Sequence, residues 1–186
     1  MRKSLLFIAL LCLTFNQSCK EEVKKDKGTT KVMTAKKIKM SLEPKSESTV
    51  TGTVAFTEEE DGKIRMVAML EGLEPGTTHA IHIHEKADCS SPDGKSTGGH
   101  WNPTAKPHGK WGDAAGFHKG DIGNLTAEEN GRAFIELSTD EWCIGCGDSN
   151  KDILGKAIIV HAGTDDFTTQ PTGAAGGRVS CGGIIE

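Results

Sequence analysis

The sequence predicts an all-β protein, folded as an antiparallel barrel or sandwich. Three observations support this fold class. Short alternating or β-branched runs recur along the chain, turn-forming residues separate them, and no helical pattern lasts longer than one turn. Many short strands at such spacing are typical of antiparallel barrels and sandwiches.

Eight runs are predicted as strands. In chain order they are Ala35–Leu42, Thr49–Thr57, Ile64–Glu71, His79–Glu85, a short run at Asp121–Thr126, Arg132–Ser138, Lys156–His161 and Arg178–Ile185. Turn-forming residues lie between several of them, at Asp61-Gly62, Glu74-Pro75-Gly76 and Asn130-Gly131. Each run is short enough for one strand of a small barrel.

Two segments break this pattern. Lys86–Gly120 is long, rich in Gly, Pro, Ser and Lys, and without periodicity, and Thr164–Gly177 is a second such segment. A long structureless loop inside a compact domain is usually functional. The metal-binding types of residue lie in these two loops or on the strands beside them, which favours a site there.

The N-terminus has the pattern of a secretory signal peptide. Arg2 and Lys3 precede the apolar run Leu5–Leu13, which is too short to span a membrane. A buried helix of the fold is the weaker alternative, because the run lies at the extreme N-terminus behind a basic pair. We therefore assign residues 1–18 to a signal peptide.

Ser18-Cys19 resembles a bacterial lipoprotein cleavage site, with Cys19 as the lipidated residue, and we favour lipidation over plain cleavage. The charged residues that follow predict a lipid-anchor and tether segment over 19–34, and the folded domain over 35–186. These features predict an exported protein of the periplasm or cell envelope. Its contact with a membrane would be through the anchor alone.

Charge limits the class of partner. Removal of residues 1–18 lowers the count of Lys and Arg from 22 to 20 against 26 Asp and Glu, so the mature net charge is about −6. This balance argues against nucleic acid as a partner, and an anionic substrate would need a local positive field. Four cysteines lie beyond Cys12 and Cys19, an even number consistent with two disulfides in an oxidising compartment.

All seven histidines fall in or around three short stretches. His82 and His84 are two residues apart on a predicted strand, so their side chains share one face. His79 has the opposite parity and is predicted to be a hydrogen-bonded structural histidine. His161 ends an apolar strand, and beside the other clusters it is a candidate ligand.

The long loop and its exit carry four further candidates: His100, His108, His118 and Asp121. Three imidazoles with one carboxylate are a common set of zinc ligands, and imidazole also suits copper. Incidental histidines in a polar loop are the weaker interpretation, given three within nineteen residues. The pattern therefore predicts a site for two metal ions.

With these motifs the chain resembles a copper/zinc superoxide dismutase of the bacterial exported type. The matching segments are His-Ala-Ile-His-Ile-His-Glu (79–85), Gly-Gly-His-Trp-Asn-Pro (98–103), Pro-His-Gly (107–109), Phe-His-Lys-Gly-Asp-Ile-Gly-Asn-Leu (117–125), Gly-Lys-Ala-Ile-Ile-Val-His-Ala (155–162) and Gly-Ala-Ala-Gly-Gly-Arg-Val-Ser-Cys-Gly (173–182). The resemblance covers roughly Ala35 to the C-terminus. It implies an eight-stranded antiparallel Greek-key barrel with a long metal-binding loop and a shorter electrostatic loop.

The resemblance also implies roles for single residues. One copper ion per subunit would bind to His82, His84, His100 and His161, and one zinc ion to His100, His108, His118 and Asp121. His100 would bridge the metals and take part in catalysis, as would Arg178, which would guide the anion. Asp165 would join a copper ligand to a zinc ligand, and Cys89 would pair with Cys181.

The implied reaction converts the superoxide anion to oxygen and hydrogen peroxide, which would protect the cell envelope. Two features depart from the family pattern. Pro171 lies in the short electrostatic loop where a lysine is common, so Lys95 in the other loop is a candidate for steering, although a solvated lysine explains it equally well. Cys143 and Cys146 form a Cys-x-x-Cys, which can be redox-active, a metal clip or a structural disulfide, and we favour the disulfide.

Two other classes of function compete with the enzyme. A protein that binds copper without catalysis would be favoured by loss of Arg178, His100 or a copper ligand, and none is lost. A structural β-sandwich with only a zinc site leaves the histidines outside the zinc set unexplained. The sequence leaves both a monomer and a homodimer open.

Overall fold

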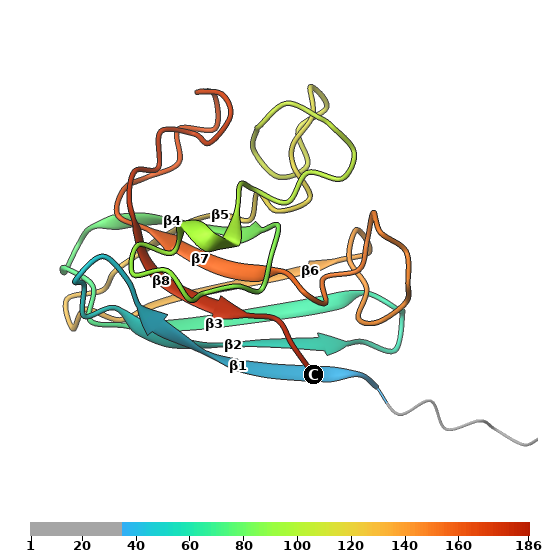
Figure 1. The fold of residues 1–186 in the computed structure, drawn as a ribbon, viewed down its shortest axis with the longest axis horizontal. Coiled ribbons are helices and arrows are strands. Elements are labelled where there is room, and N and C mark those ends of the chain that lie inside the picture. The colour runs from blue at the N-terminus through green and yellow to red at the C-terminus, as the bar shows by residue number, and fades with distance from the viewer. Residues whose placement is uncertain (1–34) are drawn as a thin grey trace, which may run out of the picture. The chain divides into compact units, whose positions relative to one another are not determined.

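Residues 35–186 are described by the computed structural model, in which they form eight antiparallel strands (Figure 1). The strands are β1 (Lys37–Pro44), β2 (Thr51–Glu58), β3 (Ile64–Glu71), β4 (Thr78–His84), β5 (Gly123–Thr126), β6 (Ala133–Thr139), β7 (Ala157–His161) and β8 (Arg178–Gly183). One short 3₁₀ turn, η1 (Lys95–Thr97), lies in the long loop. Every predicted strand is confirmed, with bounds that differ by at most two residues.

The strands form one sheet in the order β5-β4-β7-β8-β1-β2-β3-β6, and its end strands β5 and β6 lie close together. The barrel is therefore nearly closed. β3 pairs with β6 and not with β4, so the chain crosses the barrel end to build β4 and β5 before it returns. This crossover is a Greek-key connection, and it confirms the expected fold class.

Burial along the strands explains where the site forms. β3 alternates, with Ile64, Met66, Ala68 and Leu70 buried in the barrel and the residues between them facing outward. β4 and β7 are buried on both faces, because one face lines the core and the loops cover the other. Polar side chains on that covered face are thus shielded from water.

Both long loops rise over the same side of the barrel, above β4 and β7 (Figure 1). The base of the segment 101–120 is tied to β4: Trp101 N donates to Ile83 O at 2.8 Å, and Ile83 N donates to Gly120 O at 2.9 Å. Gly120 is required there, because a Cβ would lie 2.2 Å from Ile83 O. An isolated bridge also joins His84 to His100.

The signal peptide (1–18), the lipidation site Cys19 and the tether (19–34) lie outside the described residues, so they stay predictions. Among residues 35–186 the structure contains no helix long and apolar enough to cross a membrane.

Candidate metal centre

The covered face of β4 and β7 supplies the first set of histidines. His82 and His84 share that face as their parity predicts, and β7 lies alongside with His161 at its end. The loop places His100 against them, with its ring centroid 3.9 Å from that of His82 and 5.1 Å from that of His84. All four rings are buried, and one ligand atom from each lies within 4.8 Å of the others.

Each of these rings has one nitrogen occupied and one free. His82 Nε2 contacts Asp165 Oδ2 at 2.8 Å, and the backbone carbonyls of Gly98 and Gly176 accept from Nδ1 of His84 and His161. His82 Nδ1 and His100 Nε2 are buried without a hydrogen-bond partner. The remaining nitrogens, His84 Nε2 and His161 Nε2, face each other at 3.3 Å. Four imidazole nitrogens therefore converge on one point, which fits a copper ion.

The second set surrounds the carboxylate of Asp121. Its oxygens lie 2.9 Å from His100 Nδ1, 3.0 Å from His108 Nδ1 and 3.2 Å from His118 Nδ1. Despite these distances, Nδ1 of His108 and Nδ1 of His118 are buried and have no hydrogen-bond partner. Ligands about 2.0 Å from a tetrahedral ion lie about 3.3 Å apart, so the spacing fits zinc.

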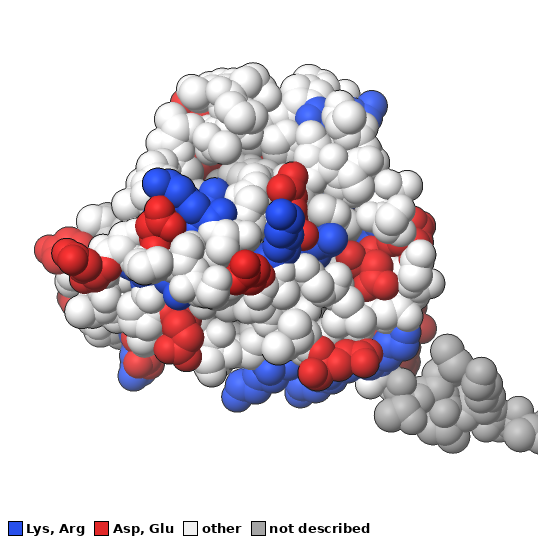
Figure 2. All heavy atoms as spheres, in the orientation of Figure 1, with Lys and Arg blue, Asp and Glu red and all other residues white. Residues whose placement is uncertain are grey.

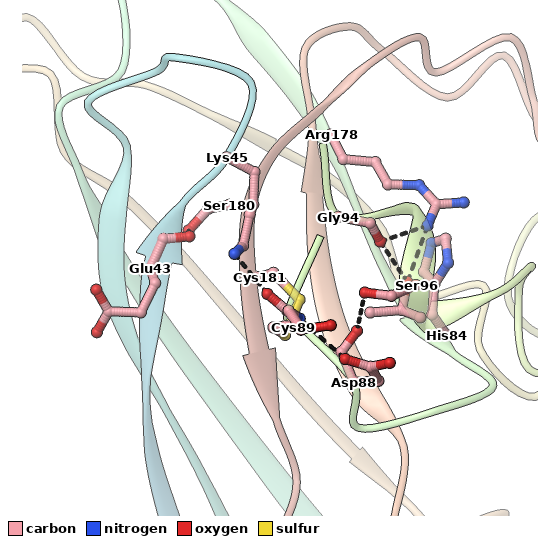
Figure 3. The surroundings of a disulfide bond; sticks show 12 residues. Glu43, Lys45, His84, Asp88, Cys89, Gly94, Ser96, Arg178, Ser180 and Cys181 are labelled. Carbon is pink, nitrogen blue, oxygen red and sulfur yellow. Dashed lines mark hydrogen bonds between the residues drawn. A yellow bond between two sulfur atoms is a disulfide. The ribbon is translucent and has the colours of Figure 1, made fainter. Parts of the chain in front are cut away.

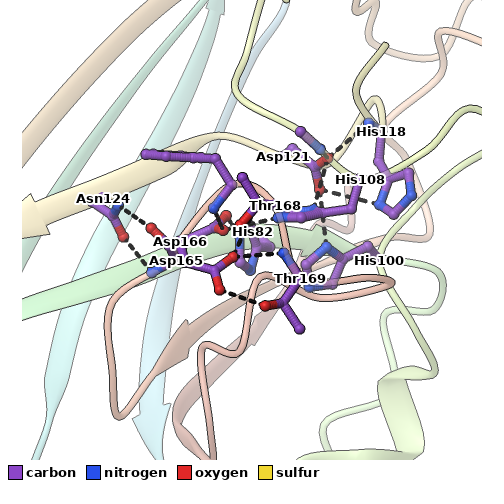
Figure 4. Close-up of polar contacts among 12 residues, drawn as sticks. His82, His100, His108, His118, Asp121, Asn124, Asp165, Asp166, Thr168 and Thr169 are labelled. Carbon is purple, nitrogen blue, oxygen red and sulfur yellow. Dashed lines mark hydrogen bonds and ion pairs between the residues drawn. The ribbon is translucent and has the colours of Figure 1, made fainter. Parts of the chain in front are cut away.

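One carboxylate connects the two sets (Figure 4). Asp165 accepts from Nε2 of His82 through Oδ2 and from Nε2 of His108 through Oδ1, both at 2.8 Å. The Asn124 side chain on β5 holds the Asp165 backbone by two hydrogen bonds of 2.8 and 2.9 Å. Such partners fix the ring orientation and leave the opposite nitrogen for the metal.

Sequence reasoning missed three residues that support this arrangement. Asn124 lies inside the family motif at 117–125, but the motif alone indicates no role for this residue. Gln170 accepts from His108 N and donates to His108 O, each at 2.8 Å, and so joins the two loops. At Gly173 a Cβ would lie 1.8 Å from Asp165 Oδ1. Only the folded arrangement of the chain reveals these contacts.

Asp165→Asn is expected to weaken zinc binding about 10- to 100-fold, because the amide cannot accept from both histidines. A chelator competition titration of the metal-free protein measures this change. Asp166→Asn is the matched control, since the neighbouring Asp166 carboxylate is exposed and contacts Thr168 and Thr169 but no histidine. Equal zinc affinity in the two variants would contradict the linking role.

The electrostatic environment of three of these histidines favours the neutral form, which is the form that binds metal ions. Burial lowers the pKa of His84 to about 2 and that of His161 to about 3, with neighbouring histidines adding to the shift. Burial likewise lowers the pKa of His100 to about 4, against its bond to Asp121. These rings are thus neutral at pH 7, as a metal ligand must be.

The two buried carboxyl groups, in contrast to these histidines, keep their charge. Burial opposes ionisation of Asp121 and Asp165, but hydrogen bonds with the histidines outweigh it and hold both pKa values well below their usual range. Burial also opposes a charge on His108, yet the adjacent Asp121 and Asp165 carboxylates raise its pKa to about 9. Zinc would therefore displace a proton from His108 when it binds near neutral pH.

A cation lies beside the first set of histidines. The Arg178 guanidinium donates to Gly94 O at 2.7 Å, Thr97 Oγ1 at 2.8 Å and Gly98 O at 2.8 Å, all around η1. The Cys89–Cys181 disulfide attaches this loop to β8, which begins at Arg178 (Figure 3). The expected pairing of Cys89 with Cys181 is present.

A hollow of about 320 Å³ leads to these groups, and its lining includes His84, His100, His161 and Arg178. Lys95 also lines it, but its ammonium is paired with Asp93 at 3.0 Å and the side chain is 77% exposed. Basic and acidic side chains are interspersed over the face shown in Figure 2. Any attraction of an anion to this hollow is therefore local, and Arg178 is its nearest fixed cation.

Two further expectations concern residues outside the metal sets. His79 donates from Nδ1 to the backbone carbonyl of His161 at 2.8 Å, which agrees with a structural role. Cys143 and Cys146 form the second disulfide that we favoured. Asp152 lies within 4.8 Å of both cysteines, so a metal clip would have three ligand atoms and lack a fourth among the described residues.

Comparison with known proteins agrees with this geometry. A sequence model of the family described as "Copper/zinc superoxide dismutase (SODC)" matches residues 50–184. The chain belongs to the copper/zinc superoxide dismutase family. The expected resemblance is confirmed.

Several solved structures are similar to most of the chain. A SOD-like protein from Bacillus subtilis is 31% identical, with a TM-score of 0.70 over 79% of this chain and 97% of that chain. A double variant of it, in which histidine replaces a tyrosine and a proline, is 32% identical, with a TM-score of 0.71 over 80% and 97%. The clock protein EA4 is 36% identical, with a TM-score of 0.68 over 80% and 94%.

These names include SOD-like proteins, so membership of the dismutase family does not by itself assign an activity. The ligand sets of this chain are the more direct indication. The set formed by His82, His84, His100 and His161 and the set formed by His100, His108, His118 and Asp121 are both assembled and buried.

Proposed function

We propose that this protein catalyses the dismutation of superoxide to oxygen and hydrogen peroxide at a copper–zinc centre. One observation carries the proposal: the His100 ring stands between two complete ligand sets. Its Nε2 belongs to the copper set, and its Nδ1 lies 2.9 Å from Asp121 in the zinc set. A ring shared in this way would couple the two metal ions.

Copper held by His82, His84, His100 and His161 would supply the one-electron oxidation and reduction that the reaction needs, which zinc cannot supply. When it is not bound to copper, His100 Nε2 would be well placed to hold a proton for the product, since it is buried, lacks a hydrogen-bond partner and belongs to a residue that lines the hollow. Asp121 and the zinc set keep the ring in orientation through Nδ1.

Arg178 is proposed to dock the anion. Its guanidinium is fixed by three acceptors on the disulfide loop, so little reorganisation is needed when a negative charge arrives. The small hollow admits a diatomic anion to the copper-binding histidines.

Arg178→Ser is expected to lower the second-order rate constant for superoxide about tenfold, because the hollow loses its fixed positive charge. Stopped-flow decay of superoxide at low ionic strength measures the change. Arg132→Ser is the control, since Arg132 pairs with Glu71 on the exposed barrel surface. An unchanged rate in Arg178→Ser with full metal content would exclude the docking role.

The decisive experiment compares superoxide decay catalysed by the chain from Lys20 to Glu186 when it carries copper and zinc and when it carries zinc alone. Fast decay that requires copper supports the dismutase. Copper bound without decay would instead support a copper-binding protein, a reading consistent with the SOD-like descriptions of the similar structures.

We further propose that the protein is exported and anchored in the cell envelope through lipidated Cys19, where it removes superoxide. Two disulfides favour an oxidising compartment, and the basic and apolar start of the sequence favours export. Cys19→Ala is expected to move the protein from the membrane fraction to the soluble fraction. Retention of the variant in the membrane fraction would contradict the anchor.

A further inference from the structure

The Cys143–Cys146 disulfide is more accessible than the other disulfide of the described chain. Cys146 is exposed and Cys143 is half-buried. In the other disulfide, Cys89 is half-buried, whereas Cys181 is fully buried and packs against Ala157 and Ile159. An external thiol can reach the first pair without opening the barrel.

The Cys143–Cys146 turn is fastened to the segment that follows it. Cys143 N donates to Lys151 O at 2.8 Å, and Ile153 N donates to Cys143 O at 3.1 Å. The Asp152 carboxylate accepts from the backbone of Gly145 at 2.9 Å and of Gly147 at 3.0 Å. These two donors flank Cys146, so their positions depend on the closed turn.

The residue before this turn supports the zinc-binding loop. Trp142 is 1% exposed, and its indole Nε1 donates to Lys119 O at 2.8 Å. Its ring lies edge-on to Trp111, with centroids 5.2 Å apart, and the Trp111 ring contacts Phe117 at a tilt of 47°, with centroids 4.9 Å apart. The Glu141 carboxylate also pairs with the Lys119 ammonium.

These contacts bracket a zinc-binding residue. His118 lies between Phe117 and Lys119, and the segment 141–142 contacts Lys119 directly and Phe117 through Trp111. The backbone of His118 is thus held by a structure that ends in the exposed disulfide.

We propose that Cys143–Cys146 is a thiol-exchange site and that its reduction loosens the zinc-binding loop through Trp142. The second half of this proposal rests on the zinc site proposed above, whereas the first half does not. Loss of the cross-link frees the turn, and Trp142 then holds Lys119 less firmly.

The exchange is a two-electron reduction by a low-molecular-weight thiol. Its thiolate attacks Sγ of the exposed Cys146, the bond to Cys143 breaks, and Cys143 leaves as a thiolate that takes up a proton. A second thiolate attacks the mixed disulfide, releases Cys146, and departs with the first as their disulfide. Two protein thiols and one small disulfide result.

The first arm of the test measures selectivity. The folded protein is treated with increasing dithiothreitol, free thiols are alkylated, and the labelled cysteines are identified by mass spectrometry. We expect Cys143 and Cys146 to be labelled at least tenfold faster than Cys89 and Cys181. Equal rates for the two pairs would overturn the exchange site.

The second arm measures zinc release to a chromogenic chelator without a reductant. The paired variant Cys143→Ala with Cys146→Ala and the variant Trp142→Phe, which keeps an aromatic ring but loses the N–H donor, are each expected to release zinc about five- to tenfold faster than the natural chain. Phe134→Ala, on the outer face of β6, is the control.

Zinc release at the natural rate from the paired cysteine variant would overturn the coupling. If that variant fails to fold, the natural protein alkylated at Cys143 and Cys146 replaces it. Failure of the natural chain to take up zinc would refute the proposed centre and with it the coupling, while the labelling arm still decides the exchange site.

Discussion

His161→Ala is expected to abolish copper-dependent decay of superoxide while one zinc ion per chain remains bound. His161 belongs to the copper set alone, and its Nε2 lies 3.3 Å from His84 Nε2 across the point where a copper ion would sit. Removal leaves three imidazoles and a cavity beside them, whereas the zinc set keeps every ligand. Metal analysis of the purified variant and stopped-flow decay of superoxide together measure the effect.

His79→Gln is the matched control for this experiment. His79 is the one histidine of the chain outside both ligand sets, and it donates to the His161 backbone carbonyl, which a glutamine amide can also contact. We expect this variant to keep its copper and its rate. Activity retained in His161→Ala would show that the copper set is assigned wrongly.

Replacing both Cys89 and Cys181 with alanine is expected to lower the free energy of unfolding by about 4–5 kcal/mol, because the bond closes a long loop in the unfolded chain. The two residues are 92 positions apart. The same variant should also lose activity, since the loop that carries the three acceptors of Arg178 would no longer be attached to β8. Urea unfolding of the metal-free protein measures the stability change.

The second disulfide provides an internal comparison. Cys143 and Cys146 are three positions apart, and the same chain-entropy argument gives about 1–2 kcal/mol for their removal. The losses of unfolding free energy in the two paired variants should therefore differ by a factor of about three. Similar losses in both would mean that loop entropy does not dominate the stabilisation.

Much of the fold follows from local pattern. β3 was predicted with its observed bounds because Ile64, Met66, Ala68 and Leu70 alternate with outward residues, and that period of two belongs to a half-buried strand. β4 and β7 were predicted from β-branched runs, although both are buried on two faces. The Greek-key order came from the family resemblance, because strand pattern alone does not distinguish barrel from sandwich.

The candidate ligands were also predictable, for a local reason. His82 and His84 share a face by strand parity, and the clustering of imidazoles in one loop is visible in the chain itself. The residues that support these ligands were harder to predict from the sequence. Asn124, Gln170 and Trp142 act through contacts with residues 41, 62 and 23 positions away, and nothing in their neighbours marks them.

The sequence by itself determined the strand pattern, the identity of the candidate metal-binding side chains and, through the family resemblance, the cysteines that pair. Only the tertiary structure decided which nitrogen of each ring is free, since that depends on acceptors such as Asp165, 83 residues from His82, and Gly176, 15 residues from His161. It also placed Arg178 beside a loop 80 or more residues earlier. Closure of the barrel brings these partners together. A single segment of sequence does not reveal such contacts, because it contains only one of the two partners.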